Sequence, residues 1–164
     1  MEMLKKNIDK NEIIFILNNL RDEDECELLA LWGEDWRNKA LSSFEGEEVL
    51  ILYGKDNYCN FVPIAMGGFC ELFEKDSKIA CVWMLTTKFI KYNKLLLSKN
   101  LKQQINNASE KYDIMYNYIY KSNYEAKNWL RKMGFKFDNP RPEKLKIAKD
   151  FEFFYKLNKR KEYY

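Results

Sequence analysis

The sequence predicts one domain of the mixed α/β class, in which helices cover the faces of a mixed sheet. Three observations support this prediction. The chain has 164 residues, of which 46% are hydrophobic, so it can bury one core of ordinary size. Segments with apolar residues at helical spacing alternate with short β-rich runs. No internal repeat or Pro/Gly/Ser-rich linker divides the chain, so residues 1–157 are assigned to one domain and residues 158–164 to a polar C-terminal tail.

The N-terminal elements are predicted from caps and apolar faces. Residues 2–6 are expected to form a short strand, and Asp9 begins a helix that extends to Leu20. An acidic first turn, which suits the positive end of the helix dipole, opens a second helix over residues 22–32, and Gly33 ends it. The inward face of this second helix is expected to hold Cys26, Leu28, Leu29 and Trp32.

Three strands are predicted in the middle of the chain. Residues 48–53 and residues 61–73 are rich in β-forming side chains and are separated by a turn. Gly67 and Gly68 permit a bulge or a close backbone approach in the second of these strands. Residues 79–85 are a continuous apolar run, which is typical of a central strand buried on both faces.

The rest of the chain is predicted to alternate helix and strand. Apolar residues recur at helical spacing over residues 88–111, and residues 113–120 return to strand. Asn123 caps a short helix that ends at Met133, and Gly134 stops it. The predicted order β-α-α-β-β-β-α-β-α-β-β closes with two short strands, over residues 135–137 and 151–157.

Charge is distributed unevenly along the chain. Residues 1–87 carry 9 basic and 17 acidic side chains, whereas residues 88–164 carry 19 basic and 8 acidic ones. A basic second half attracts an anionic ligand. No apolar run approaches the ~20 residues of a membrane span, no signal peptide is recognised, and no nucleic-acid-binding motif occurs. We therefore expect a cytoplasmic protein without a membrane partner.

The residue types present limit the chemistry. The absence of histidine excludes His-based triads, Cys–His dyads and His-ligated zinc. The four cysteines, at positions 26, 59, 70 and 81, form no Cys-x-x-Cys pair, so no metal site is expected. Without a secretory signal, buried free thiols are favoured over disulfides.

The fourth predicted helix carries a motif with a specific spacing. An Asn is followed by an Ala, by an aromatic–aliphatic pair and, eleven residues after the Asn, by Gly-Phe; the matching residues are Asn123, Ala126, Trp129, Leu130, Gly134 and Phe135. Together with the element order, this motif resembles the GNAT (Gcn5-related N-acetyltransferase) fold. The resemblance implies a single GNAT-like domain.

A narrower resemblance covers about residues 17–157. It is to a tailed-phage branch of the same fold that includes the internal virion protein A of short-tailed coliphages. The matching stretches are Asn19–Arg21 with Asp24 and Glu27, Trp83–Thr86, Tyr112, Asn117–Ile119, Trp129–Phe135, Pro140, Pro142 and Phe151–Tyr155. The resemblance implies a bacteriophage or prophage origin, and it allows association with a virion.

GNAT enzymes move an acetyl group from acetyl-CoA to an amine. The resemblance implies that pantetheine pairs with the backbone of Trp83, Met84 and Leu85 as an added strand would, and that Asn123 is available to it. Pyrophosphate would lie at the N-terminus of the next helix, where free N–H groups and the dipole attract anions. The residues expected to bind it are Thr86, Thr87, Lys88 and Asn93.

Two positions depart from the family pattern. The usual loop between strand and helix contains glycines that let phosphate approach the backbone, whereas residues 85–94 contain none. The lysines at positions 88, 91 and 94 either bind phosphate instead or are exposed lysines of a capped helix. Leu130 replaces a tyrosine that, in many relatives, protonates the leaving thiolate.

The catalytic groups are therefore assigned from other residues. Tyr120, on the fifth predicted strand, is the candidate proton donor. Glu71, late in the third strand, is the candidate base, acting through water on the amine, and its alternative is an ordinary surface carboxylate. Arg21, Asp24 and Glu27 are interpreted as a salt-bridge set on one helix face, or else as part of an acceptor cleft.

Three functional hypotheses follow, and the sequence leaves open whether the protein is an enzyme. The first is an acetyl-CoA-dependent N-acetyltransferase that modifies an amine of a host or phage protein. The second is a catalytically silent GNAT-like virion or assembly protein. The third is an inhibitor of a host defence system that acts by protein binding. Each expects a protein partner or a protein substrate.

Overall fold

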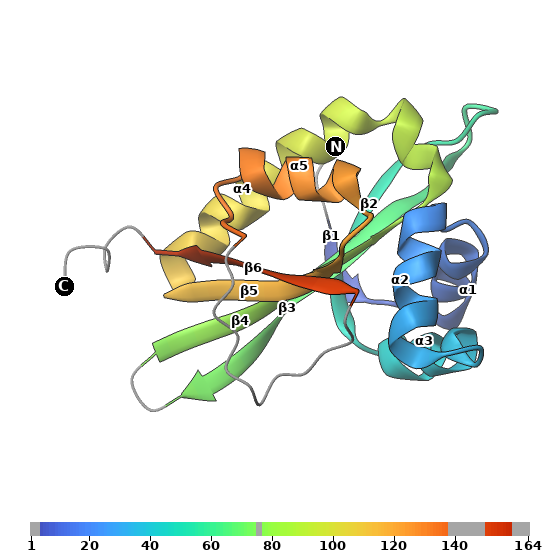
Figure 1. Ribbon diagram of the computed structural model, residues 1–164. Helices are drawn as coiled ribbons and strands as arrows, with labels where there is room; N and C mark the ends of the chain where they lie inside the picture. Colours follow the sequence, from blue (N-terminus) through green and yellow to red (C-terminus); the bar gives the residue numbers. More distant parts are fainter. Residues whose placement is uncertain (1–3, 75–76, 138–149, 159–164) are drawn as a thin grey trace. The chain divides into compact units, whose positions relative to one another are not determined.

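The computed structural model describes residues 4–74, 77–137 and 150–158. Its strands are β1 Leu4–Asn7, β2 Glu48–Lys55, β3 Phe61–Glu74, β4 Ser77–Thr86, β5 Ile114–Tyr120 and β6 Phe151–Leu157. They form one sheet in sequence order, in which β4 and β5 are parallel and the pairs β1–β2, β2–β3 and β5–β6 are antiparallel (Figure 1). The helices are α1 Lys10–Asn18, α2 Asp22–Trp32, α3 Trp36–Phe44, the 3₁₀ helix η1 Lys88–Tyr92, α4 Lys94–Lys111 and α5 Tyr124–Lys132. The predicted mixed α/β class is confirmed.

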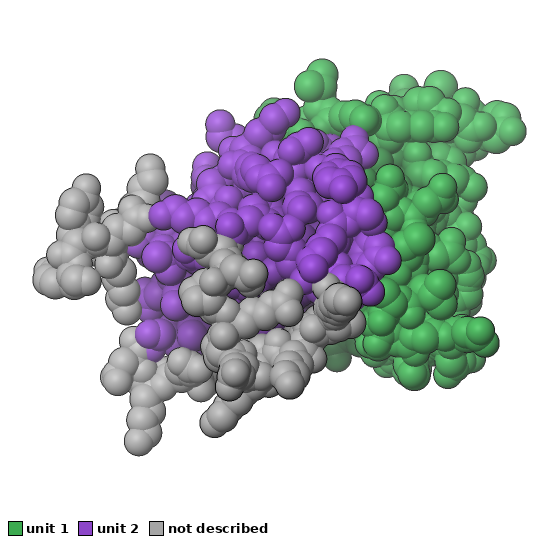
Figure 2. Space-filling view, viewed as in Figure 1, with its two compact units in different colours: residues 1–68, 84–100 green, residues 69–83, 101–164 purple. Residues whose placement is uncertain are grey.

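The chain divides into two compact units (Figure 2). Unit 1 consists of residues 1–68 and 84–100, and unit 2 consists of residues 69–83 and 101–164. The division falls within β3, β4 and α4, so each of these elements contributes residues to both units. The single domain over residues 1–157 stays a prediction, and the predicted tail beyond Asn158 lies outside the described residues.

The first helix of unit 1 begins where the sequence predicts. Asp9 is its N-cap: the Asp9 Oδ1 accepts the backbone N–H of Glu12 at 2.9 Å, and the Glu12 side chain accepts the backbone N–H of Asp9. This capping box satisfies two donors at the helix end. Ile13, Ile16 and Leu17, spaced for one face of the helix, are buried.

Two predictions for the next segment are wrong. The structure adds a helix, α3, whose buried residues are Trp36 and Ala40. Two apolar residues one turn apart are too weak a signal to distinguish a helix from a polar loop. In α2 the buried side chains are Asp24 and Leu28, one turn apart, so Leu29 is exposed instead of facing the core.

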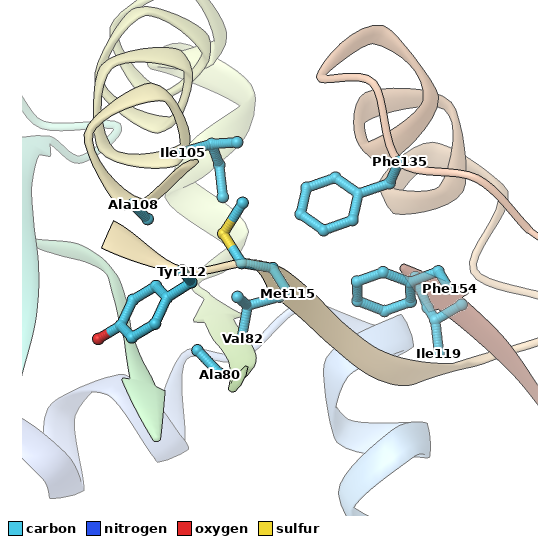
Figure 3. Close-up of a cluster of buried hydrophobic side chains, with 9 residues drawn as sticks. All are labelled: Ala80, Val82, Ile105, Ala108, Tyr112, Met115, Ile119, Phe135 and Phe154. Atoms are coloured by element: carbon cyan, nitrogen blue, oxygen red, sulfur yellow. The ribbon is translucent and has the colours of Figure 1, made fainter. Parts of the chain in front are cut away.

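Unit 2 has its own core, in which nine buried side chains pack together (Figure 3). They come from β4, α4 and the residue after it, β5, β6 and the segment after α5, and they are Ala80, Val82, Ile105, Ala108, Tyr112, Met115, Ile119, Phe135 and Phe154. Partly buried side chains, Phe69 and Leu130 among them, pack against this cluster. Because strand side chains alternate between faces, Met115 and Ile119 place the tyrosines at 116, 118 and 120 on the opposite face of β5.

The strand predicted over residues 135–137 is reduced to a single bridge. Gly134, at φ +84°, follows α5, and the Phe135 ring enters the core of unit 2. Lys136 then exchanges two backbone hydrogen bonds with Tyr155 of β6, at 2.8 and 3.0 Å. The backbone of this segment thus pairs with β6 only at Lys136, because the preceding residue, Phe135, packs in the core of unit 2.

The cysteines are free thiols, but the prediction that they are buried is wrong. Cys26, Cys59 and Cys70 are exposed, and Cys81 is half-buried. Strand alternation explains why Cys70 is exposed: its neighbour Phe69 points toward the core of unit 2, so Cys70 points away from it.

The described part of the chain contains neither a helix fit to span a membrane nor a metal-ligating cluster. None of its helices has both the length and the hydropathy to cross a bilayer. No group of three or more acidic or thiol side chains among these residues is arranged to hold a metal ion.

Candidate functional site

In unit 1, the end of β4 is held by hydrogen bonds to other parts of the protein. The backbone N–H and the hydroxyl of Thr86 both donate to Asp24 Oδ2, at 3.1 and 2.6 Å. The N–H and hydroxyl of Thr87 both donate to the Ile64 carbonyl, at 2.9 and 3.2 Å. The Lys88 N–H donates to the Asn19 carbonyl at 2.8 Å. Three consecutive amides are therefore already bonded, and a phosphate would have to find donors further along the chain.

Asp24, which anchors Thr86, is also paired with a buried arginine. Arg21 Nε donates to Asp24 Oδ2 and Arg21 Nη2 to Asp24 Oδ1, each at 3.1 Å. The two side chains are 8% and 4% exposed. The salt bridge predicted for this pair is confirmed. The Asp24 carboxylate thus receives four hydrogen bonds, which compensate for the loss of its hydration on burial.

Asn93 separates η1 from α4. Its Nδ2 donates to the carbonyls of Lys55 and Phe89, at 2.8 and 2.9 Å, and its Oδ1 accepts the Lys55 N–H at 3.3 Å. A Cβ at Gly54 would lie 2.5 Å from Asn93 Oδ1, so glycine is needed for this close approach. The unbroken helix predicted over residues 88–111 is wrong, because Asn93 bonds to β2 and divides the segment.

A cavity of about 380 Å³ lies at the start of α4, within unit 1. Its lining residues are Lys91, Tyr92, Asn93, Lys94, Leu95 and Leu96. The Leu97 N–H donates to the Asn93 carbonyl at 2.9 Å, which marks the start of the 18-residue helix α4, and residues of its first turn line this space. Helix N-termini favour anions, and two lysines here add positive charge. The sequence from Ser77 to Ser109 contains no acidic residue, so nothing along this stretch opposes that charge.

In unit 2, the pairing between β4 and β5 ends after three residues. The parallel ladder runs from Ile79–Ile114 to Cys81–Tyr116. Beyond it, the side-chain Nδ2 of Asn117 donates to the Val82 carbonyl at 2.6 Å. A side-chain amide thus takes the place of a backbone donor at this point, while β5 stays paired with β6 as far as Tyr120.

The predicted ligand Asn123 is the N-cap of α5. Its Oδ1 accepts the Ala126 N–H at 3.3 Å, and the residue is 1% exposed. The cap gives the side-chain oxygen of this buried residue a hydrogen-bond partner. Contact between Asn123 and a pantetheine arm stays a prediction.

Glu71 belongs to a cluster with two residues at the end of α4. Its Oε1 accepts the Tyr112 hydroxyl at 2.8 Å and forms an ion pair with Lys111. Burial raises the pKa of the Tyr112 hydroxyl, Lys111 opposes this shift, and the bond to Glu71 adds to it. The hydrogen bond to Glu71 also raises the pKa of Lys111. Oε1 of Glu71 is thus already engaged by two donors of the protein.

Tyr120 lies on the other face of the sheet of unit 2. Its ring packs edge-on against Phe151, with centroids 5.5 Å apart. Glu71 faces α4, whereas Tyr120 alternates with Ile119 and so points away from the core that α4 covers. The structure does not bring the two candidate catalytic residues together.

The predicted cofactor residues are shared between the two units. Trp83 and Asn123 belong to unit 2; Met84, Leu85, Thr86, Thr87, Lys88 and Asn93 belong to unit 1. Trp83 and Met84 are half-buried, Leu85 to Thr87 are buried, and Lys88 is exposed. Sequence reasoning places Asn117 only within the stretch that resembles the phage branch and gives it no role, although a single Asn between two tyrosines of a hydrophobic strand is a visible signal.

No family model matches the sequence, and no curated protein matches it either. Solved structures do resemble it. They include an aminoglycoside N(6')-acetyltransferase from Legionella pneumophila, with 17% identity over 98% of this chain and 95% of that one and a TM-score of 0.65. A GNAT-family acetyltransferase from Bacillus anthracis has 12% identity, 96% coverage of both chains and a TM-score of 0.64.

A third similar structure is that of a spermidine N-acetyltransferase from Vibrio cholerae in complex with CoA and spermine. It has 14% identity to this chain, 96% coverage of both chains and a TM-score of 0.57. At these identities the likeness shows the fold alone. The GNAT fold expected from the motif around Asn123 is confirmed.

Proposed function

We propose that the protein binds acetyl-CoA and transfers its acetyl group to an amine. The observation that carries this proposal is the likeness to acetyltransferase structures over 94% or more of the chain. Two local features support it independently, one in each unit. One is the lysine-lined cavity at the start of α4, which would hold the pyrophosphate. The other is the early end of the β4–β5 ladder, beyond which the pantetheine arm would pair with β4.

The residues present fit acetyl-CoA if its pyrophosphate binds further along the chain than the sequence predicts. Since the amides of residues 86–88 are bonded within the protein, Lys91 and Lys94 with the first turn of α4 would hold the pyrophosphate. Thr86 and Thr87 would act by holding the segment in place. The backbone of Trp83, Met84 and Leu85 would pair with the pantetheine arm. Acetyl-CoA supplies an activated acyl thioester.

The reaction then requires a base and a proton donor from the chain. A neutral amine attacks the thioester carbonyl, so a C–N bond forms, the C–S bond breaks and the thiolate takes up a proton. Leu130 packs against the core of unit 2 and has no proton to give. Tyr120 is our first choice as donor, because it lies on the part of β5 beyond the β4–β5 ladder. Glu71 stays a predicted base.

Titration calorimetry with acetyl-CoA tests the binding step, with desulfo-CoA as a second ligand. We expect micromolar affinity, and about tenfold weaker binding for the variant with Lys91→Gln and Lys94→Gln, because two charges near the phosphates are lost. Lys99→Gln is the matched control, as it removes an exposed lysine of the same helix. Absence of binding at millimolar acetyl-CoA would refute the proposal.

Acetyl transfer to amine-bearing peptides and polyamines tests the chemical step. Tyr120→Phe is expected to lower kcat about 100-fold and to leave the Kd for acetyl-CoA unchanged, as general-acid catalysis is lost while the cofactor still binds. An unchanged kcat would remove Tyr120 from the mechanism.

The bonded amides of residues 86–88 favour a second candidate function, a catalytically silent GNAT-like protein. On this alternative the chain is a phage virion or assembly protein, or an inhibitor of a host defence system, and it acts by binding a protein in the host cytoplasm or the virion. The resemblance of the stretch around Trp83–Thr86 to a phage branch supports it. Its expected result is no affinity for acetyl-CoA together with stable co-purification of a phage or host protein.

A further inference from the structure

Cys70 and Cys81 lie directly opposite each other on neighbouring strands of unit 2. The register follows from both ends of the β3–β4 pair. At one end, the Thr87 N–H donates to the Ile64 carbonyl at 2.9 Å. At the other, β3 ends at Glu74 and β4 begins at Ser77. Ten positions separate Ile64 from Glu74 and ten separate Ser77 from Thr87, so the pairing has no net slip.

The same count places the two cysteines. Cys70 is six positions after Ile64, and Cys81 is six positions before Thr87. Hydrogen-bonded and non-hydrogen-bonded pairs alternate along an antiparallel ladder. Because six is an even number, the Cys70–Cys81 pair is of the same hydrogen-bonded type as the Ile64–Thr87 pair. Directly opposed residues of this type have Cα atoms about 5.5 Å apart, which lies within the range that disulfides span.

Both side chains point to the same face of the sheet. The neighbours of Cys81, Ala80 and Val82, are in the core of unit 2, and Phe69 beside Cys70 packs against that core. Both cysteines therefore face away from the core. Cys70 is exposed and Cys81 is half-buried, so only one of the two meets a reagent readily. Burial raises the pKa of the Cys81 thiol to about 11, and the charge on Cys70 adds to this.

We propose that Cys70 and Cys81 form a reversible disulfide when the protein meets a small-molecule disulfide such as glutathione disulfide. The Cys70 thiolate attacks one sulfur of the reagent and releases a glutathione thiolate, which leaves a mixed disulfide on Cys70. Cys81 loses its proton to solvent, attacks the Cys70 sulfur and releases the second glutathione thiolate. Two protein thiols are oxidised, and one glutathione disulfide is reduced to two glutathione molecules.

The order of the two steps follows from the surroundings of each thiol. Exposure makes Cys70 the first to react, whereas Cys81 stays protonated while it is only half-exposed. The mixed disulfide with glutathione removes the negative charge of Cys70. That charge is one of the two causes that raise the pKa of the Cys81 thiol. In a hydrogen-bonded pair the opposed Cβ atoms are about 5.5 Å apart, farther than the roughly 3.5–4.5 Å of a relaxed disulfide, so the two strands must shift slightly to form the bond. The linkage is therefore strained and is reduced easily. It is therefore a labile bond rather than a permanent one.

Peptide mapping of the oxidised full-length chain tests this proposal. The native protein is treated with excess glutathione disulfide, its remaining thiols are alkylated, and proteolytic fragments are identified by mass spectrometry. We expect a linked fragment pair containing Cys70 and Cys81, with glutathione adducts on Cys26 and Cys59, and full reversal by dithiothreitol. Glutathione adducts on Cys70 without linkage to Cys81 would show that the proposal is wrong.

A matched variant tests the register. Cys81→Ser with Ile79→Cys moves the second thiol two positions along β4, diagonal to Cys70 and about 7–8 Å away. We expect at least about tenfold less linked fragment in this variant, since a diagonal pair exceeds the span of a disulfide. Equal linkage in both proteins would mean that the strands exchange register and that the opposed placement is not what joins the thiols. The outcome does not depend on acetyl-CoA binding.

Discussion

Among the described residues, each unit contains a cluster of a lysine, a glutamate and a tyrosine. The cluster of unit 1 consists of Lys6, Glu12 and Tyr53; that of unit 2 consists of Lys111, Glu71 and Tyr112. In both, the glutamate accepts from the ammonium group and the phenol. The two glutamates differ in exposure, since the side chain of Glu12 is 15% exposed and that of Glu71 is 37% exposed.

The comparison shows that contacts alone do not identify a catalytic base. Glu12 makes the same pair of contacts as Glu71, and it ties α1 to β1 and β2 in a part of the chain where no chemistry is predicted. Glu71 likewise ties β3 to the end of α4. Burial, which decides how much a lost partner costs, separates the structural carboxylates from those that are available for other roles.

Asp24 is more buried than Glu12 and Glu71, with a side chain that is 4% exposed, so its replacement should lower the free energy of unfolding the most. Asp24→Asn removes the charge of a buried carboxylate that receives hydrogen bonds from Arg21 and Thr86, so we expect a loss of about 3–5 kcal/mol in the free energy of unfolding. Urea denaturation followed by circular dichroism measures it. Asp22→Asn, an exposed position in the same helical turn, is the control. A loss below about 1 kcal/mol would show that burial does not rank these carboxylates.

Glu12→Gln should have an intermediate effect. The variant keeps the shape of the side chain but weakens its bonds to Lys6 and Tyr53, so we expect a loss of about 1–2 kcal/mol. Urea denaturation gives the value, with Glu23→Gln as the exposed control. If the variant is as stable as the control, the cluster of unit 1 contributes nothing measurable to folding.

Glu71→Gln should reduce stability less than Glu12→Gln, because the pair with Lys111 is exposed and is screened by water. The same variant separates the two roles open to Glu71. A lost acetyl-transfer rate in a protein of normal stability supports the predicted base, whereas a normal rate makes Glu71 a structural residue like Glu12. Glu12→Gln is the matched control, since it disturbs an equivalent cluster to which no role in the reaction is assigned.

The smallest expected effect is a decrease of the free energy of unfolding at alkaline pH. The pKa values of Tyr53 and Tyr112 are raised, chiefly by burial, and those of Lys6 and Lys111 are raised by their bonds to glutamate. A group whose pKa is raised on folding stabilises the protein below its unfolded pKa, and this contribution is lost as pH rises. We expect the free energy of unfolding to fall as the pH increases beyond about 10. A flat profile from pH 8 to pH 11 would contradict this assignment of causes.

The sequence predicts the fold well where signals are local. The capping box at Asp9, the apolar run of β4 and the motif from Asn123 to Phe135 each lie within a few turns or one strand, and each led to a correct element. The long helix predicted over residues 88–111 is wrong because of a distant partner. Asn93 breaks the predicted long helix by bonding to Lys55, 38 positions away.

The candidate site was harder to predict for the same reason. The amides of Thr86 to Lys88 look available in the sequence, and the acceptors that occupy them are far away along the chain. Asp24, for example, lies 62 positions from Thr86. No local pattern records that bond. The side of the sheet that Glu71 faces also depends on which helix covers it, so its separation from Tyr120 follows only from the structure.

The single bridge between Lys136 and Tyr155 bears on self-association. β6 is last in the order of the described sheet, and its sequence, Phe-Glu-Phe-Phe-Tyr-Lys-Leu, is rich in aromatic residues. An open strand edge of this composition is a template for pairing with another chain and for aggregation. Lys136 occupies the backbone N–H and carbonyl of Tyr155 at the middle of that edge and places a lysine beside it. The one-residue bridge therefore takes away two of the backbone groups with which a strand of a second molecule would pair.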